Sequence, residues 1–259
     1  MMAAAVKALQ QKIPSQEIVL ARSLFMVVAT SIFLIHSHLS FWGNNKKLLF
    51  LRGFFGFLGL SAFFYTLTTI PIADSVVIQY TSPIFTALLA IVILKEKTNK
   101  KQWMAFVLAF IGVVLVIKPG FSLTFIPAFI GLCGACSSGV AYNLVRKLRE
   151  SEHPMNIIFY LPAVSIPLSL PGAISDFVLP SGEQWIWLIL IGAFTFVAQI
   201  FLTIGLHREK AAKATTVSYI TVVFSILWGL IFWKEIPDSY SLSGAILILG
   251  AIYLTASSK

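Results

Sequence analysis

Charged residues are scarce in this chain of 259 residues. They make up 11% of the sequence, whereas soluble globular proteins carry about 25%. Hydrophobic residues make up 58%, with 22 phenylalanines and six tryptophans among the aromatic residues. So few polar side chains cannot cover a water-facing surface, which excludes both a soluble enzyme and a disordered chain. The composition therefore predicts an all-α membrane protein that crosses the bilayer several times.

Further absences narrow the function. The two cysteines, Cys133 and Cys136, lie in one apolar segment, and a single C-x-x-C pair makes neither a disulfide framework nor a metal site. The sequence contains no Walker-type phosphate-binding loop, so ATP would not drive the protein directly. The net charge of +9 would favour nucleic acid in a soluble chain, but there is no soluble domain to present a basic face. We expect no cofactor, no metal and no nucleic-acid partner.

Nine apolar stretches are long enough to be membrane-spanning helices, which need about 20 residues each. They are 17–35, 50–70, 74–94, 102–118, 124–146, 155–174, 184–206, 213–233 and 240–257. Ahead of them, Met1–Gln11 is apolar but short, and it lacks the charged start and cleavage site of a signal peptide. We interpret it as the end of a truncated first helix. The sequence thus predicts ten transmembrane helices.

Basic residues gather in alternate loops. Fourteen of the 19 lysines and arginines are assigned to one side: Lys46, Lys47, Arg52, Lys95, Lys97, Lys100, Lys101, Arg146, Lys147, Arg149, Arg208, Lys210, Lys213 and Lys259. The opposite loops hold mostly acidic residues. Because cytoplasmic loops carry the excess of Lys and Arg, this side and the C-terminus are expected in the cytoplasm. The expected location is the plasma membrane, or the inner membrane of a bacterium.

An internal repeat appears when the sequence is shifted by 139 residues. Ile72–Tyr80 then falls on Ala211–Tyr219, and Lys95-Glu96 falls on Lys234-Glu235. We predict two repeats, 1–119 and 120–259, of five helices each. Because five is odd, the second repeat is inverted in the membrane, which is the recurrent architecture of secondary transporters.

The repeat also carries a family resemblance. Pro71-Ile-Ala73, Tyr80-Thr-Ser-Pro83, Lys95-Glu96, and then Gln102 and Gly112 resemble the EamA-type module of the drug/metabolite transporter superfamily. The second copy is similar, although Val222 stands where the first has Pro83. The resemblance implies ten helices, cytoplasmic termini, and a central cavity lined mainly by helices 1, 3, 4, 6, 8 and 9.

Candidate substrate ligands are uncharged polar or aromatic side chains. They are Tyr65, Gln79, Tyr80, Ser82, Asn143, Gln199, Ser218, Tyr219 and Thr221. Gln79 and Ser82 belong to a polar stripe at helical spacing, and Ser218 and Thr221 are their repeat partners. Such stripes line a cavity or hydrogen-bond neighbouring helices, and the sequence leaves both alternatives open. Gly131, Ala135 and Gly139 form a small-residue face, for which close helix packing is the expected role.

Four charged residues are candidates for structural or gating roles: Lys7, Arg22, Glu96 and Glu235. Arg22 lies inside an apolar span, where it either extends to the membrane interface or takes the structural or gating role that the resemblance implies. The resemblance also singles out Lys7. Glu96 and Glu235 end equivalent helices against the helix dipole. The adjacent Lys95, Lys97 and Lys234 could neutralise them, but we favour a tie from each glutamate to another helix.

These features favour a secondary transporter over an enzyme. We expect a small polar metabolite as substrate, such as an amino acid, a nucleobase or S-adenosylmethionine, moved by alternating access between inverted repeats. Two alternatives are a membrane scaffold that transports nothing and an intramembrane hydrolase. The second rests only on a faint Gly59-Leu-Ser61 similarity to a protease serine loop. Besides the substrate, the lipid bilayer is the expected partner.

Overall fold

The computed structural model describes residues 9, 13–70, 72–95, 99–117, 125–175, 177–220 and 239–257. Throughout these ranges every regular element is a helix. The helices are α2 (Ser15–His36), α3 (Lys46–Thr69), α4 (Ile72–Gln79), α5 (Ser82–Ile93), α6 (Lys100–Ile117), α7 (Phe125–Leu148), α8 (Pro154–Ser175), α9 (Glu183–Arg208), α10 (Ala211–Val217) and α12 (Ser239–Ser257).

The prediction of an all-α, multi-pass membrane protein is confirmed. Within the described ranges, six segments are long and apolar enough to cross a membrane, and Leu242–Leu254 is a shorter apolar helix. Large apolar side chains also face outwards, among them Ile32 on α2 and Phe201 on α9. Outward apolar faces of this extent suit lipid and not water. Most of the segment predicted to be a first helix, and most of the predicted span 213–233, lie outside the described residues, so the count of ten helices stays a prediction.

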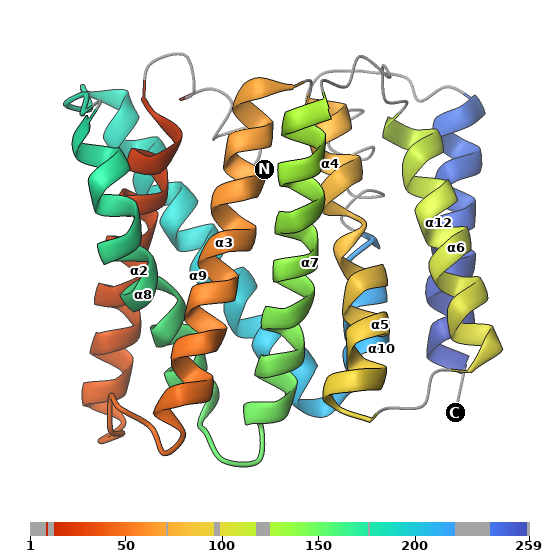
Figure 1. Ribbon diagram of the computed structural model, residues 1–259, viewed down its shortest axis with the longest axis horizontal. Coiled ribbons are helices and arrows are strands. Elements are labelled where there is room, and N and C mark those ends of the chain that lie inside the picture. Colours follow the sequence, from red (N-terminus) through yellow and green to blue (C-terminus); the bar gives the residue numbers. More distant parts are fainter. Residues whose placement is uncertain are drawn as a thin grey trace.

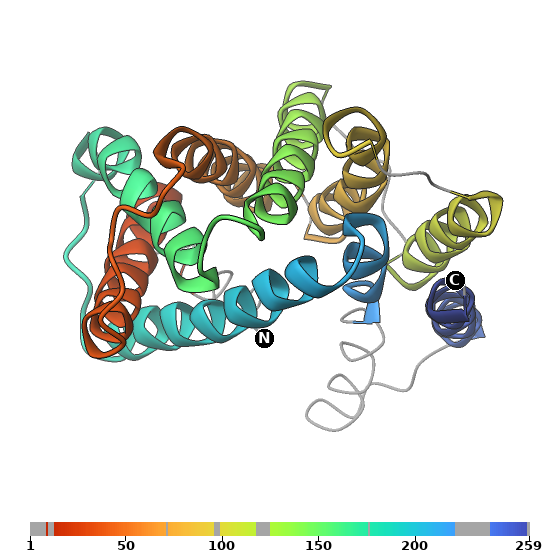
Figure 2. The same ribbon diagram turned by 90° about the horizontal axis from the view of Figure 1, so that it is seen from below.

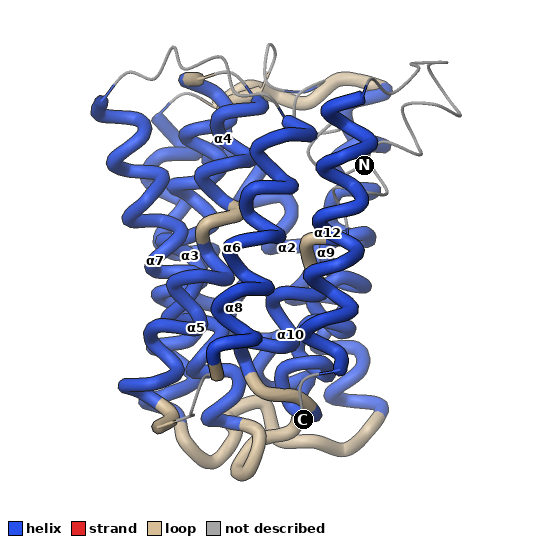
Figure 3. Tube along the Cα trace, turned by 90° about the vertical axis from the view of Figure 1, so that its right-hand side faces the viewer, coloured by secondary structure: helices blue, strands red, loops and turns tan. Residues whose placement is uncertain are grey.

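The helices run side by side in one bundle with an elongated cross-section (Figures 1 and 3). Seen along the helices, α2 and α8 lie at one end of this cross-section, and α6 and α12 lie at the other (Figure 2). Helices α3 and α7 pack together on one long side, with α9 on the opposite long side (Figure 2). The interior between these two sides contains the candidate site.

Small residues let α3 and α7 approach closely. A Cβ added at Gly59 would lie 2.3 Å from Ser138 Oγ, and one added at Gly134 would lie 2.4 Å from the Cβ of Ala62. Further along α7, a Cβ at Gly139 would lie 3.0 Å from the backbone nitrogen of Thr86 on α5. On the predicted small-residue face, a Cβ added at Gly131 would also lie 2.8 Å from Ile78 Cγ2, so Gly131 and Gly139 pack closely against α4 and α5.

The predicted span 74–94 crosses the bundle but is broken in the middle. Helix α4 ends at Gln79, and α5 begins at Ser82 with Pro83 in its first turn. Pro83 has no N–H to offer the carbonyl of Gln79, and its ring would collide with that carbonyl in a continuous helix. At the break, Thr81 Oγ1 donates to the carbonyl oxygen of Ile78 at 2.6 Å. The break interrupts the single helix face predicted for the polar stripe.

The loops that follow α2, α7 and α9 lie at the same end of the bundle, where α12 also ends (Figure 1). Most of the predicted basic clusters flank these loops. The loop between α8 and α9 lies at the opposite end (Figure 1). In the described part of the chain, these three basic loops and the loop between α8 and α9 thus lie at opposite ends of one bundle.

We predict that these two ends face opposite sides of the membrane. With Cys133 and Cys136 replaced by serine, Lys210→Cys and Ser181→Cys introduce single thiols at exposed loop positions at the two ends. In intact cells, a membrane-impermeant thiol reagent should label residue 181 and leave residue 210 unlabelled until the membrane is permeabilised. Labelling of both residues from one side would contradict the predicted orientation.

Candidate functional site

A cavity of about 80 Å3 lies among α2, α3, α4, α7, α8 and α9. Its polar lining consists of Arg22, Arg52, Gln79, Ser138, Tyr142 and Gln199. Leu60, Phe63 and Leu161 form much of its apolar lining. A space of this size holds several water molecules or a small polar group. The cavity therefore combines convergent hydrogen-bonding groups with an apolar wall, which is the usual composition of a small-molecule site.

Two arginines dominate the charge of the cavity. The side chains of Arg22 and Arg52 are each only 2% exposed. Arg52 Nη2 donates a hydrogen bond to Gln199 Oε1 at 3.2 Å, whereas Arg22 has no side-chain hydrogen bond to any described residue. Neither Nε atom has a partner there, and no aspartate or glutamate is among the described residues that line the cavity. The site is therefore positive, and most of its guanidinium donors are unused.

A glycine makes room for the guanidinium group of Arg52. Gly56 lies one turn further along α3, and a Cβ there would be 2.5 Å from Arg52 Nη1 and 2.6 Å from Leu161 Cδ1. Any larger residue at position 56 would collide with this guanidinium group and with Leu161 unless one of the side chains moved. The backbone of α3 thus approaches α8 closely at the depth of the buried charge.

The assignment of Arg52 to a basic loop was wrong, because this residue lies in the second turn of α3 and is buried. A signal was present in the sequence. Arg52 is followed by glycines at 53, 56 and 59, and such spacing indicates a helix face that packs closely against neighbours. A positively charged residue at the start of such a packing face, as Arg52 is, is expected to point into the protein and not into a loop.

Arg22 is the sequence candidate that the structure brings to this cavity from α2. Its burial excludes the alternative in which the side chain extends to the membrane interface. Gln79, at the last turn of α4, and Gln199, in α9, line the same space. Three of the residues singled out in the sequence therefore meet in one cavity, although they come from distant parts of the chain.

Tyr80 and Tyr219 meet each other at the break between α4 and α5. Their rings stack with centroids 5.5 Å apart and an interplanar angle of 29°. The hydroxyl of the fully buried Tyr219 donates to the carbonyl oxygen of Tyr80 at 2.8 Å. A break inside a membrane leaves backbone carbonyls without helical donors, so this bond satisfies one of them. The pair joins the broken helix to the residues that follow α10.

The other predicted ligands are not among the residues that line the cavity. Asn143 Nδ2 donates to the carbonyls of Thr86 and Gly139, at 3.0 and 2.9 Å, which ties α7 to α5. Ser218 Oγ donates to the carbonyl of Thr215. Tyr65 is half-buried on α3, and Ser82 is buried at the start of α5. Substrate contact by these four residues stays a prediction.

Four sequence candidates lie outside the described residues: Lys7, Glu96, Thr221 and Glu235. Their predicted roles stay predictions.

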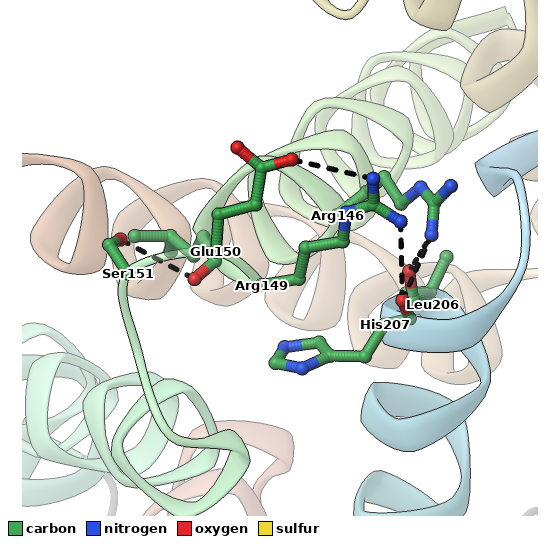
Figure 4. Close-up of polar contacts among 7 residues, drawn as sticks. Arg146, Arg149, Glu150, Ser151, Leu206 and His207 are labelled. Atoms are coloured by element: carbon green, nitrogen blue, oxygen red, sulfur yellow. Dashed lines mark hydrogen bonds and ion pairs between the residues drawn. The ribbon is translucent and has the colours of Figure 1, made fainter.

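At the basic end, two arginines bind the end of a helix (Figure 4). Arg146 Nη1 donates to the carbonyl oxygens of Leu206 and His207 at 3.1 and 3.0 Å, and Arg149 Nη1 donates to that of His207 at 3.4 Å. The last carbonyls of a helix have no helical donor and carry the negative end of its dipole. Part of the basic cluster at the end of α7 therefore holds the end of α9.

A carboxylate that the sequence analysis did not identify fixes the loop between α2 and α3. Glu152 accepts hydrogen bonds from the backbone N–H groups of Asn44 and Asn45. Gly43, in the left-handed region at φ +59°, leaves space for that carboxylate, because a Cβ there would lie 2.5 Å from Glu152 Oε2. Nearby, Tyr160 donates to the carbonyl of Trp42 at 2.9 Å. Hydrogen bonds thus hold the loop after α2 against the loop after α7 and the start of α8.

Comparison with known proteins identifies the family. The model of the EamA-like transporter family matches residues 1–118 and 125–257. The chain belongs to this family. As an EamA-like protein it is a multi-pass membrane transporter, and the resemblance found in the sequence is confirmed.

Relatives of this EamA-like transporter are named for transport. The pseudopaline exporter of Pseudomonas aeruginosa is 30% identical over the whole chain and 92% of its own length. The S-adenosylmethionine uptake transporter of Rickettsia prowazekii is 28% identical over 81% of this chain and 71% of its own. Solute carrier family 35 member G1 of Homo sapiens is 28% identical over 93% of this chain and 71% of its own length. These names describe transporters and not enzymes.

A solved crystal structure supports the fold. It covers 99% of this chain and 93% of its own, with a TM-score of 0.82 and 17% sequence identity.

We predict that the bond between Tyr219 and Tyr80 stabilises the bundle. Tyr219→Phe removes only the hydroxyl and should lower the free energy of unfolding by about 1 kcal/mol, because a buried carbonyl loses a donor. Thermal unfolding of the purified protein in detergent measures the change. Tyr253→Phe on the exposed face of α12 is the matched control and should be neutral. Equal melting temperatures for both variants would show that the bond contributes nothing.

Proposed function

We propose that the chain is a secondary transporter that carries a small polar metabolite through the cavity by alternating access between two inverted repeats. The observation that carries this proposal is that residues from both predicted repeats line the cavity. Residues 139 positions apart, which the repeat makes equivalent, meet in the same space. Arg22 and Leu161 form one such pair, and Leu60 and Gln199 form another.

The same equivalence recurs throughout the described bundle. Tyr80 and Tyr219 are repeat partners, and they stack on each other. Helices α2 and α8 are predicted equivalents that pack together, as are α6 and α12 (Figure 2). In transporters with inverted repeats, a two-fold axis in the membrane plane relates the two repeats. Elements that lie next to this axis contact their own equivalents in the other repeat. These contacts support a substrate site at the meeting point of the two halves.

Equivalent contacts also hold the two ends of the bundle. Glu17, in the first turn of α2, accepts a hydrogen bond from the backbone N–H of Val178, just after α8, at 3.0 Å. Its repeat partner Asn156, in the first turn of α8, donates to the carbonyl of Ser40, just after α2. Two similar ties at opposite ends suit a mechanism in which one end opens while the other stays closed.

The relatives support a metabolite as substrate and leave both directions of transport available. One similar protein is named for export and another for uptake of S-adenosylmethionine. Amino acids, nucleobases and S-adenosylmethionine are the substrate classes that we propose. Uptake of labelled compounds from these classes into proteoliposomes that contain the purified chain tests the proposal. Flux above that of protein-free liposomes is expected for at least one compound, and its absence for all classes would contradict it.

Gln79→Leu gives a sharper prediction. The side chain of Gln79 lines the cavity and makes no hydrogen bond to any described residue. The variant should therefore fold with an almost unchanged melting temperature but lose at least about tenfold in flux, since one polar contact with a substrate is worth about 1.4 kcal/mol or more. Ser243→Leu, on the exposed face of α12, is the control and should transport normally. Full flux in Gln79→Leu would remove this residue from the site.

A further inference from the structure

Among the described residues, the two buried arginines of the cavity have fewer hydrogen-bond acceptors than their guanidinium groups could use. Arg22 and Arg52 come from different helices, reach the same space, and are each only 2% exposed. Their two positive charges repel each other. Within the described part of the chain, Gln199 accepts one hydrogen bond from Arg52, and nothing accepts one from Arg22. An arginine in the middle of a membrane protein is costly, so such a residue points to a function.

Two other arginines of the chain have a clear structural role and serve as a comparison. Arg146 and Arg149 direct their guanidinium groups at the free carbonyls that end α9 (Figure 4). Arg22 and Arg52 have no comparable carbonyl acceptor among the described residues. Their unused donors instead line an open space.

We propose that Arg22 and Arg52 together bind the carboxylate of the transported metabolite, so that the substrates of this chain are small carboxylic acids or zwitterions such as amino acids. The proposal rests on the function proposed above, because it takes the cavity to be the transport site. It narrows the substrate from any polar metabolite to one that carries an acid group, and it disfavours neutral nucleobases.

Geometry and chemistry support a carboxylate. The planar guanidinium group pairs with two oxygens at once, and this makes arginine the preferred residue for carboxylates in interior sites. Leu60, Phe63 and Leu161 offer an apolar wall for the rest of the molecule. A bound anion would remove the repulsion between the two arginines and satisfy their donors.

The first test needs no substrate. If Arg22 is held unpaired for a ligand, Arg22→Gln should raise the melting temperature of the purified protein by about 2–4 °C, because an unneutralised buried charge is removed. Arg146→Gln, which deletes the structural bonds at the end of α9, should lower it. A fall in melting temperature for Arg22→Gln would show a structural arginine and overturn the proposal.

The second test compares compounds that differ only in the acid group. Binding is followed by the shift in melting temperature with L-methionine and L-methioninamide, with S-adenosylmethionine and its decarboxylated form, with succinate and succinamide, and with inorganic phosphate. At least one acid should stabilise the protein while its amide or decarboxylated partner does not. Arg22→Gln and Arg52→Gln should abolish the shift, and Arg208→Gln, an exposed control, should keep it. Stabilisation by phosphate alone, or equal shifts within every pair, overturns the assignment.

Flux separates the two proposals. A chain that transports a compound and its amide equally well, before and after Arg22→Gln, is a transporter whose substrates do not use the arginine pair. A chain that binds acids through both arginines but moves none of them across proteoliposomes has the anion site without the transport function. Transport that requires the acid group and drops at least tenfold in Arg22→Gln supports both.

Discussion

Two buried positive charges are the constraint around which the described interior is arranged. An arginine at the centre of a membrane-spanning helix costs about 2.5–3.5 kcal/mol on membrane-insertion scales, and here two arginines on membrane-spanning helices are buried at one cavity. Gly56 gives the guanidinium group of Arg52 its space, and Gln199 gives it an acceptor. Both arginines keep further donors that have no acceptor among the described residues. Burying two arginines with unused donors does not stabilise a fold. We therefore attribute the cavity to a role of these two charges in binding and not to the packing of the helices.

The break between α4 and α5 is the second feature that shapes the site. Because Pro83 stops α4 from continuing, Gln79 lies at a helix end and lines the cavity. The break also frees carbonyl groups, and the hydroxyl of Tyr219 satisfies the one on Tyr80. The stacked tyrosines therefore join elements from both halves of the chain close to the break.

Much of the fold was predictable because its signals are compositional and local. A scarcity of charge fixes the membrane class, small residues at helical spacing on α7 mark a packing face, and the repeat motif leads to the family. The cavity was only partly predictable. Gln79, Gln199 and Arg22 stood out as polar residues inside apolar spans, but Arg52 was hidden by two lysines that begin the same helix. Asn143 is tied to a carbonyl 57 residues away, and no local pattern shows such a contact.

A structure of the protein with a transported solute bound tests the account most directly. The account predicts an acid group of the solute between α2 and α3, with its oxygens within about 3 Å of the guanidinium nitrogens of both Arg22 and Arg52, and with Gln79 in contact with the same molecule. A solute bound elsewhere, with both arginines still directed into a cavity that holds no anion, would contradict the central claim.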